Sequence, residues 1–194
     1  MLTVKLRPKV PRRIALPAGA SLLFCIAATS VARLPVGLPG CKSHEGCDPN
    51  EPCVCTGGTD CYLGCTGDGC SQDCHNVGDS CGTVCNDHCT SLCHDTNDCT
   101  SSCGNDCGIT CHNVASCGAI CGDDCRYDCE SVATCGVHAG PGSTILCNSV
   151  STCDAECTGS CHVTCTNVSQ CNVDCLGGGA PITCPDGSVA CGAC

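Results

Sequence analysis

The sequence predicts an all-β protein, a disulfide-stapled β-solenoid, and two observations lead to this prediction. The chain has 32 cysteines among 194 residues but only two Tyr, one Phe and no Trp. So little aromatic bulk cannot fill a large conventional core, so covalent bridges must replace much of it. The cysteines also recur at a fixed spacing, which means that one structural unit stacks on itself. Two series have an 18-residue period: Cys93, Cys111, Cys129, Cys147 and Cys165, and Cys99, Cys117, Cys135, Cys153 and Cys171.

Each repeat, or rung, has the form Cys-x3-Cys-x3-Cys-x3-Cys-x5, and about seven rungs fit between residues 55 and 177. In a β-strand, residues i, i+2 and i+4 share a face, so each Cys-x3-Cys block directs two sulfurs and one central side chain inward. The central side chains of the later rungs are mostly small or apolar, as an interior requires. They are Ile109, Tyr127, Ile145 and Val163 in one series and Ala119, Val137, Ala155 and Val173 in the other, whereas Ser91 and Ser101 take these places earlier.

The five-residue connections carry a valine column, in which each valine follows an Asn or a Ser. We expect valine to fill the corner and Asn or Ser to bond the local backbone, as these residues do in turns. An α-helix also fits the period, because 18 residues make five helical turns. However, Gly, Asn, Asp, Ser, Thr, Val and Cys dominate the repeats, and they are middling to poor helix formers. The valines are Val114, Val132, Val150 and Val168.

The disulfide pairing is suggested by one rung in which Ala139 and Ser143 replace two cysteines together. A bridge across the short turn loses both partners at once, whereas rung-to-rung pairing would leave partners unpaired above and below. Strand ends that meet at a turn can also approach to the ~5.5 Å that a disulfide needs, while the two cysteines of one strand lie ~13 Å apart. We therefore expect bridges across the long and the short turns, which alternate along the chain.

The expected bridges join Cys55 with Cys61, Cys65 with Cys70, Cys74 with Cys81, Cys85 with Cys89, Cys103 with Cys107, Cys111 with Cys117, Cys121 with Cys125, and Cys157 with Cys161. The cysteines of the regular rungs that we expect in bridges are Cys93, Cys99, Cys103, Cys107, Cys111, Cys117, Cys121, Cys125, Cys129, Cys135, Cys147, Cys153, Cys157, Cys161, Cys165 and Cys171.

The N-terminus reads as an export signal, because five basic residues precede an apolar run from 14 to 32 that ends in a small-residue site. A retained membrane anchor is the alternative, since the run is about long enough to span a bilayer. Leu38-Pro39-Gly40-Cys41 resembles the bacterial lipobox, which makes Cys41 a lipidation candidate. The expected organisation is a signal peptide (1–32), a linker and N-terminal cap (33–54), the solenoid (55–177) and a C-terminal cap (178–194).

The charge distribution limits the partners. All 19 acidic residues lie after residue 40, where only Lys42 and Arg126 are basic, so this part has a formal charge of −17. Such a surface repels nucleic acid and anionic membranes, so we expect no nucleic-acid partner and membrane contact only through a signal or lipid anchor. It attracts cations or basic partners, although acidic residues also simply keep an exported protein soluble.

Two columns of side chains are candidate metal ligands. His75, His94 and His112 follow equivalent cysteines in successive rungs, with Glu130 next, so imidazoles at that spacing could share a transition metal such as zinc. Oxygen ligands that could hold calcium line the short turns. Both columns also fit exposed turn residues that repeat with the unit. The oxygen ligands are Asp87, Asn105, Asp106, Asp123 and Asp124.

Other chemical motifs are weaker. Thiolate metal clusters favour Cys-x-Cys and Cys-x2-Cys, which occur here only at Cys53-Val-Cys55 and Cys191-Gly-Ala-Cys194. Gly78-Asp79-Ser80-Cys81-Gly82 matches the Gly-x-Ser-x-Gly elbow of hydrolases, but that motif needs a strand-turn-helix and a distant His and acid. We therefore expect no enzymatic activity and no cofactor other than calcium or zinc.

The architecture resembles the disulfide-stapled β-helix of beetle antifreeze proteins, whose coils are short and filled with cysteine. The regular Thr-x-Thr ladder of that family is missing, so the resemblance implies the fold and not ice binding. The coil length also resembles the calcium-binding β-roll of RTX toxins, without its Gly-Gly-x-Gly-x-Asp pattern. Blocks such as Cys161-His-Val-Thr-Cys165 and Cys171-Asn-Val-Asp-Cys175 resemble cysteine-rich repeats of uncharacterised bacterial surface proteins.

These observations predict an exported, non-enzymatic structural or adhesive protein of the cell surface or extracellular space. Its partner, a protein or a surface, is not specified by the sequence. The alternative is a secreted cation-binding protein that uses the histidine column, the acidic turn edge or free thiols.

Overall fold

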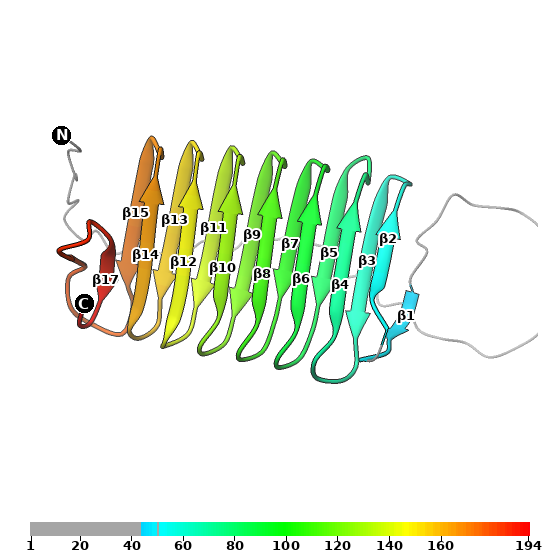
Figure 1. Ribbon diagram of the computed structural model, residues 1–194, viewed down its shortest axis with the longest axis horizontal. Helices are drawn as coiled ribbons and strands as arrows, with labels where there is room; N and C mark the ends of the chain where they lie inside the picture. The colour runs from blue at the N-terminus through cyan, green and yellow to red at the C-terminus, as the bar shows by residue number, and fades with distance from the viewer. Residues whose placement is uncertain (1–43, 50) are drawn as a thin grey trace, which may run out of the picture. The chain divides into compact units, whose positions relative to one another are not determined.

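The computed structural model describes residues 44–49 and 51–194, which form a β-solenoid of about seven turns made of two sheets (Figure 1). The first sheet has eight strands in the order β1(His44–Cys47), β3(Asp60–Cys65), β5(Ser80–Val84), β7(Asp98–Ser102), β9(Ser116–Cys121), β11(Thr134–Ala139), β13(Thr152–Cys157) and β15(Gln170–Cys175). The second has nine, in the order β16(Ile182–Thr183), β17(Val189–Cys191), β14(Cys161–Thr166), β12(Ser143–Asn148), β10(Arg126–Glu130), β8(Gly108–His112), β6(Thr90–His94), β4(Ser71–His75) and β2(Cys53–Thr56).

The strands of successive turns pair in parallel and in the register that the cysteine period predicts. Tyr127 of β10 pairs with Ile109 of β8 on one side and with Ile145 of β12 on the other. At the C-terminal end, β16 and β17 form an antiparallel pair, and β17 covers β14. The all-β solenoid with 18-residue rungs is therefore confirmed.

Two columns of turn residues have left-handed backbone conformations. Asn, Asp or Ser occupies each of these positions except that of His88. Asn and Asp accept positive φ better than most other non-glycine residues, and their short polar side chains bond nearby groups. At the long turns the residues are Asn76, Asp95, Asn113, Ser131, Ser149 and Asn167, with φ between 52° and 56°, and at the short turns they are His88, Asp106 and Asp124. The predicted valines Val114, Val132 and Val150 are buried and Val168 is partly buried, while Thr96 takes the equivalent buried place after Asp95.

The interior changes character along the solenoid. In the later turns the predicted central side chains are buried, with Ile145 and Val163 at 0% exposure. Tyr127 is also buried, and its hydroxyl donates to the Cys117 carbonyl at 3.2 Å. In the earlier turns the interior is mostly polar, although Leu63 of β3 is also fully buried. The buried polar side chains at its centre are Gln72, Thr83, Ser91 and Ser101.

The polar side chains of the earlier turns bond one another and the backbone. Thr83 Oγ1 lies 2.8 Å from the hydroxyls of both Ser91 and Ser101. Gln72 donates from Nε2 to the carbonyls of Leu63 and Val84, both at 3.1 Å. These bonds offset much of the cost of burying polar groups. Within the described residues, Gln72 Oε1 is buried without a hydrogen-bond partner.

Fourteen disulfides connect the described cysteines, and most cross the turns as expected. The turn bridges have Cα–Cα distances of 5.5–6.6 Å, within the normal range of 4.4–6.8 Å. They join Cys47 with Cys53, Cys55 with Cys61, Cys65 with Cys70, Cys74 with Cys81, Cys93 with Cys99, Cys111 with Cys117, Cys121 with Cys125, Cys129 with Cys135, Cys147 with Cys153, Cys157 with Cys161, and Cys165 with Cys171.

The structure corrects two of the expected pairings. Cys85 bonds to Cys103 in the next rung and not to Cys89, and neither Cys107 nor Cys89 is paired. The physical reason is that residues in register on adjacent parallel strands are as close as residues across a turn, here 4.8 Å between Cα atoms. In the C-terminal cap the bridges are Cys175 with Cys191 and Cys184 with Cys194.

The expected signal peptide (1–32), the lipidation candidate Cys41 and the first part of the linker lie outside the described residues. Within residues 44–49 and 51–194, no helix is long and apolar enough to cross a membrane.

Candidate metal centre and surface trough

The histidine column lies at the ends of three adjacent strands of the second sheet. His75 ends β4, His94 ends β6 and His112 ends β8, and the strand register pairs each with the next. The rings stack, with centroids 4.9 Å apart between His75 and His94 and 4.6 Å apart between His94 and His112. The sequence-predicted column therefore exists, and Glu130 follows it in the same register.

Asp73 turns part of this column into a candidate metal centre. Asp73 Oδ1 lies 3.0 Å from His75 Nδ1 and 3.5 Å from His94 Nε2. These three ligand atoms lie within 4.8 Å of one another, and all three side chains are partly buried. Metal–ligand bonds of about 2.0–2.2 Å allow ligand atoms up to about 4.2 Å apart, so small side-chain rotations would let one ion contact all three.

Asp95 orients the middle imidazole of the column. Its Oδ2 accepts a hydrogen bond from His94 Nδ1 at 2.7 Å, which leaves Nε2 of His94 facing Asp73. A carboxylate on the outer nitrogen of a metal-binding histidine fixes its tautomer and raises its basicity. The hydrogen bond from His94 also lowers the pKa of Asp95, with Asn113 a second donor, so Asp95 stays ionised.

The stacking excludes a site shared by all three histidines. An imidazole nitrogen binds a metal through a lone pair in the ring plane, so an ion cannot be held between stacked ring faces. An ion that contacts Asp73, His75 and His94 therefore requires these two rings to rotate out of the stack, and His112 is not part of this three-ligand cluster. Asp73 and Asp95 were not predicted from the sequence. Asp73 could have been found, because it lies two residues before His75 on the same strand face.

The predicted calcium ligands of the short turns bond the neighbouring backbone instead of converging. Asp87 Oδ1 accepts from the backbone NH of Asn105 at 2.7 Å, and Asn105 Oδ1 accepts from that of Asp123 at 2.8 Å. Asp106 lies 3.5 Å from His88 Nε2. Among the described residues, Asp87, Asp106, Asp123 and Asp124 do not form a three-ligand cluster. The arrangement links one turn to the next, and calcium binding stays a prediction.

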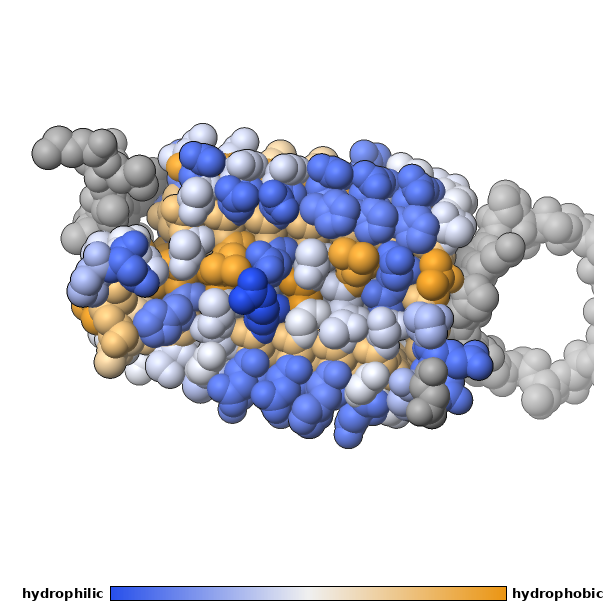
Figure 2. Space-filling view, in the orientation of Figure 1, coloured by the Kyte–Doolittle hydropathy of each residue, from blue (hydrophilic) through white to orange (hydrophobic). Residues whose placement is uncertain are grey.

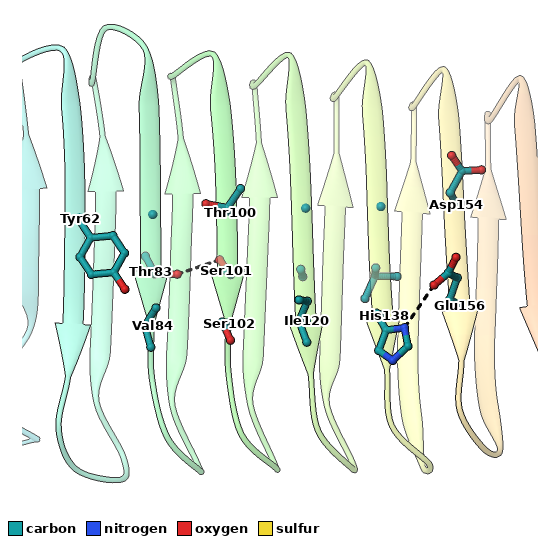
Figure 3. Close-up of a pocket in the computed structure, with 15 residues that line it drawn as sticks. Tyr62, Thr83, Val84, Thr100, Ser101, Ser102, Ile120, His138, Asp154 and Glu156 are labelled. Carbon is teal, nitrogen blue, oxygen red and sulfur yellow. Dashed lines mark hydrogen bonds and ion pairs between the residues drawn. The ribbon is translucent and has the colours of Figure 1, made fainter. Parts of the chain in front are cut away.

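The first sheet carries a shallow trough of about 500 Å³ along its outer face (Figure 3). The trough runs across the strands from β3 to β13, because Gly82, Gly118 and Gly136 have no side chains to fill its floor. Tyr62 and Ile120 are 56% and 61% exposed along it. The β13 end of the trough is acidic, and there Glu156 pairs with His138 at 3.3 Å (Figure 3).

Hydrophilic residues gather along the two long edges of the face shown in Figure 2, where the turns of Figure 1 lie, while hydrophobic residues occur between these edges. On this face, polar turn columns therefore flank a less polar sheet surface. No protein-family model, no curated protein and no solved structure matches this chain. The geometry of its own residues therefore carries the functional argument.

Proposed function

We propose that this chain is an exported, non-enzymatic structural protein of the cell surface or extracellular space. The observation that supports it best is the extent of disulfide bonding, because 28 of the 30 cysteines from Cys47 onward are in bridges. Disulfides persist in oxidising compartments and are rare in the cytosol. Each small loop closed by a bridge contributes on the order of 2 kcal/mol in the chain-entropy model, so many such loops give a resistant scaffold.

The structural role is tested by comparing oxidised and reduced protein in the same protease and heating series. The oxidised chain is expected to resist digestion and to keep its β-sheet circular dichroism on heating, and the chain reduced in denaturant and then alkylated is expected to lose both properties. Equal resistance of the two forms would contradict the proposal. Antibody labelling of intact producing cells and of the culture medium tests export separately.

An adhesive role would use the trough of the first sheet. The trough combines the exposed side chains of Tyr62 and Ile120 with the acidic end at Glu156. In a cell-binding assay with labelled protein, Ile120→Asp is expected to reduce binding. Leu176→Asp is the matched control, because Leu176 is 56% exposed but does not line the trough. Equal binding by both variants and the unaltered chain would mean that the trough is not the adhesive surface.

The second candidate function is binding of a transition-metal ion, and the cluster of Asp73, His75 and His94 favours it. A metal ion binds the deprotonated imidazole nitrogen, so protons compete with the metal and its affinity should fall as the solution is made more acidic. Zinc or copper(II) titration followed by calorimetry is expected to show one site that Asp73→Asn and His94→Gln remove. His138→Gln, on the other sheet, is the control and should bind normally. A titration unchanged by Asp73→Asn would contradict the assignment.

A further inference from the structure

Four cysteines, Cys85, Cys89, Cys103 and Cys107, lie at the short turns of two consecutive rungs. The sulfur of Cys89 lies within 4.8 Å of those of Cys65 and Cys70 in the preceding rung. Cys85 and Cys103 are bonded, while Cys89 and Cys107 are unpaired and 1% and 2% exposed. The sulfur of Cys107 lies within 4.8 Å of those of Cys85 and Cys103. All other cysteines of residues 44–49 and 51–194 are in bridges, so these two thiols are exceptional.

The backbone around the two thiols is already in register. The amide of His88 donates to the carbonyl of Asn105 at 2.9 Å, and that of Gly108 donates to the carbonyl of Cys89 at 2.9 Å. Cys89 and Cys107 therefore occupy equivalent places just before the adjacent strands β6 and β8, as Cys85 and Cys103 do just after β5 and β7. That neighbouring pair has a Cα–Cα distance of 4.8 Å, which is within the range that a disulfide spans.

These four cysteines also lie where the repeat becomes regular. Equivalent cysteines are 20 residues apart from Cys65 to Cys85 and 19 apart from Cys70 to Cys89, whereas both steps into the next rung are 18 residues. A one-residue or two-residue insertion changes the turn but leaves the strand register intact. Rung-to-rung bridges at this point would fix the irregular turns to the regular ones.

We propose that Cys89 and Cys107 close a second rung-to-rung disulfide beside the bridge between Cys85 and Cys103. Two S–H bonds break and one S–S bond forms. The two protons and two electrons pass to a disulfide oxidant, either a small-molecule disulfide or a thiol oxidoreductase, which is reduced to two thiols. The carbonyls of Asn86 and Asn105, at 3.2 Å and 3.4 Å from the Cys107 sulfur, hold this thiol in place before closure.

Closure depends on access of the oxidant before the turn is packed. Burial raises the pKa of the Cys107 thiol, so little of the reactive thiolate forms in the folded chain. Oxidation of the folded chain should therefore be slow and should speed up in denaturant. The fully oxidised chain then has no free thiol from Cys47 onward.

Single serine variants reveal the partner of each cysteine. The full chain is produced in an oxidising compartment, denatured in acid to stop exchange, alkylated with a maleimide and mapped by mass spectrometry. Unaltered protein is expected to show no alkylation at Cys89 or Cys107, and Cys107→Ser is expected to expose Cys89. The matched control is Cys125→Ser, which should expose Cys121 because that bridge crosses a turn.

Three results would overturn the proposal. Alkylation of both Cys89 and Cys107 in the unaltered oxidised chain would mean that the thiols stay free. Exposure of Cys103 by Cys107→Ser would mean that the bridge crosses the turn. If Cys107→Ser protein does not fold, peptides from Asp-N digestion of the unaltered chain, which separates all four cysteines, give the same answer. Direct linkage of Cys89 with Cys107 supports the proposal there, and linkage of Cys103 with Cys107 overturns it.

Discussion

The earlier turns of the solenoid, up to β7, and the later turns, from β8 to β14, share one strand register but have different interiors. The earlier interior contains hydrogen-bonded polar groups around Thr83, while the later interior contains Ile109, Tyr127 and Ile145. The earlier turns have insertions and the rung-to-rung bridge, whereas the later rungs keep the 18-residue period. Register and cysteine spacing therefore set this fold, and the central side chains can be either apolar or polar groups that are mostly hydrogen-bonded; in the part of the chain that the structure describes, Gln72 Oε1 is buried without a partner.

The largest effect is expected from removing apolar volume in the later turns. Ile145→Ala should lower the free energy of unfolding by about 3 kcal/mol, because Ile145 is fully buried between Tyr127 and Val163. Chemical unfolding of the oxidised chain measures the loss. A loss below about 1 kcal/mol would mean that the bridges alone hold these turns and that the difference between the interiors has no energetic role.

The short turns of the later rungs should tolerate no added methyl group. A Cβ at Gly140 would lie 2.5 Å from the carbonyl oxygen of Gly122, whereas one at Gly136 would meet nothing within 4 Å. Gly140→Ala should therefore cost about 2 kcal/mol of unfolding free energy, and Gly136→Ala should be nearly neutral. Thermal unfolding of the two variants side by side makes the comparison, and equal transition temperatures would contradict the close packing of successive turns.

Disrupting the polar interior of the earlier turns should cause a smaller loss of unfolding free energy. Thr83→Val keeps the shape but removes the hydroxyl that contacts Ser91 and Ser101, so it should cost about 1–2 kcal/mol. Thr100→Val is the control, because Thr100 is exposed on the neighbouring strand. If Thr83→Val stabilises the chain, the hydroxyl cluster is a defect and not a satisfied substitute for an apolar interior.

The smallest expected change in the free energy of unfolding comes from Tyr127, the one tyrosine in the later interior. Burial raises the pKa of Tyr127 far above its usual value of about 10, so the folded chain keeps the neutral phenol while the unfolded chain ionises. The stability contribution is therefore present below pH 10 and decreases as the pH rises above it. Tyr127→Phe should remove this decrease, which short unfolding measurements between pH 9 and 11 can detect. If the free energy of unfolding falls equally steeply with pH in both proteins, the burial of Tyr127 is contradicted.

The sequence predicted the repeat and the interior better than the individual bridges and the site. Tyr127, Ile145 and their column could be placed inward because the cysteine spacing fixes which strand face they share. The partner of Cys85 could not be chosen, since a position across the turn and one in the next rung are both within bonding distance. The histidine column was visible from its period, but the position of Asp95 beside His94 depends on the left-handed conformation of Asp95.

A complete disulfide map tests whether disulfides close both the long and the short turns of this parallel solenoid. The oxidised chain is denatured in acid without reduction, alkylated and digested, and the linked peptides are sequenced by mass spectrometry. The expected map contains Cys111 with Cys117, Cys121 with Cys125 and Cys147 with Cys153, and at least 28 of the 30 cysteines from Cys47 onward resist alkylation. Extensive alkylation, or links between cysteines on non-adjacent turns, would contradict the account.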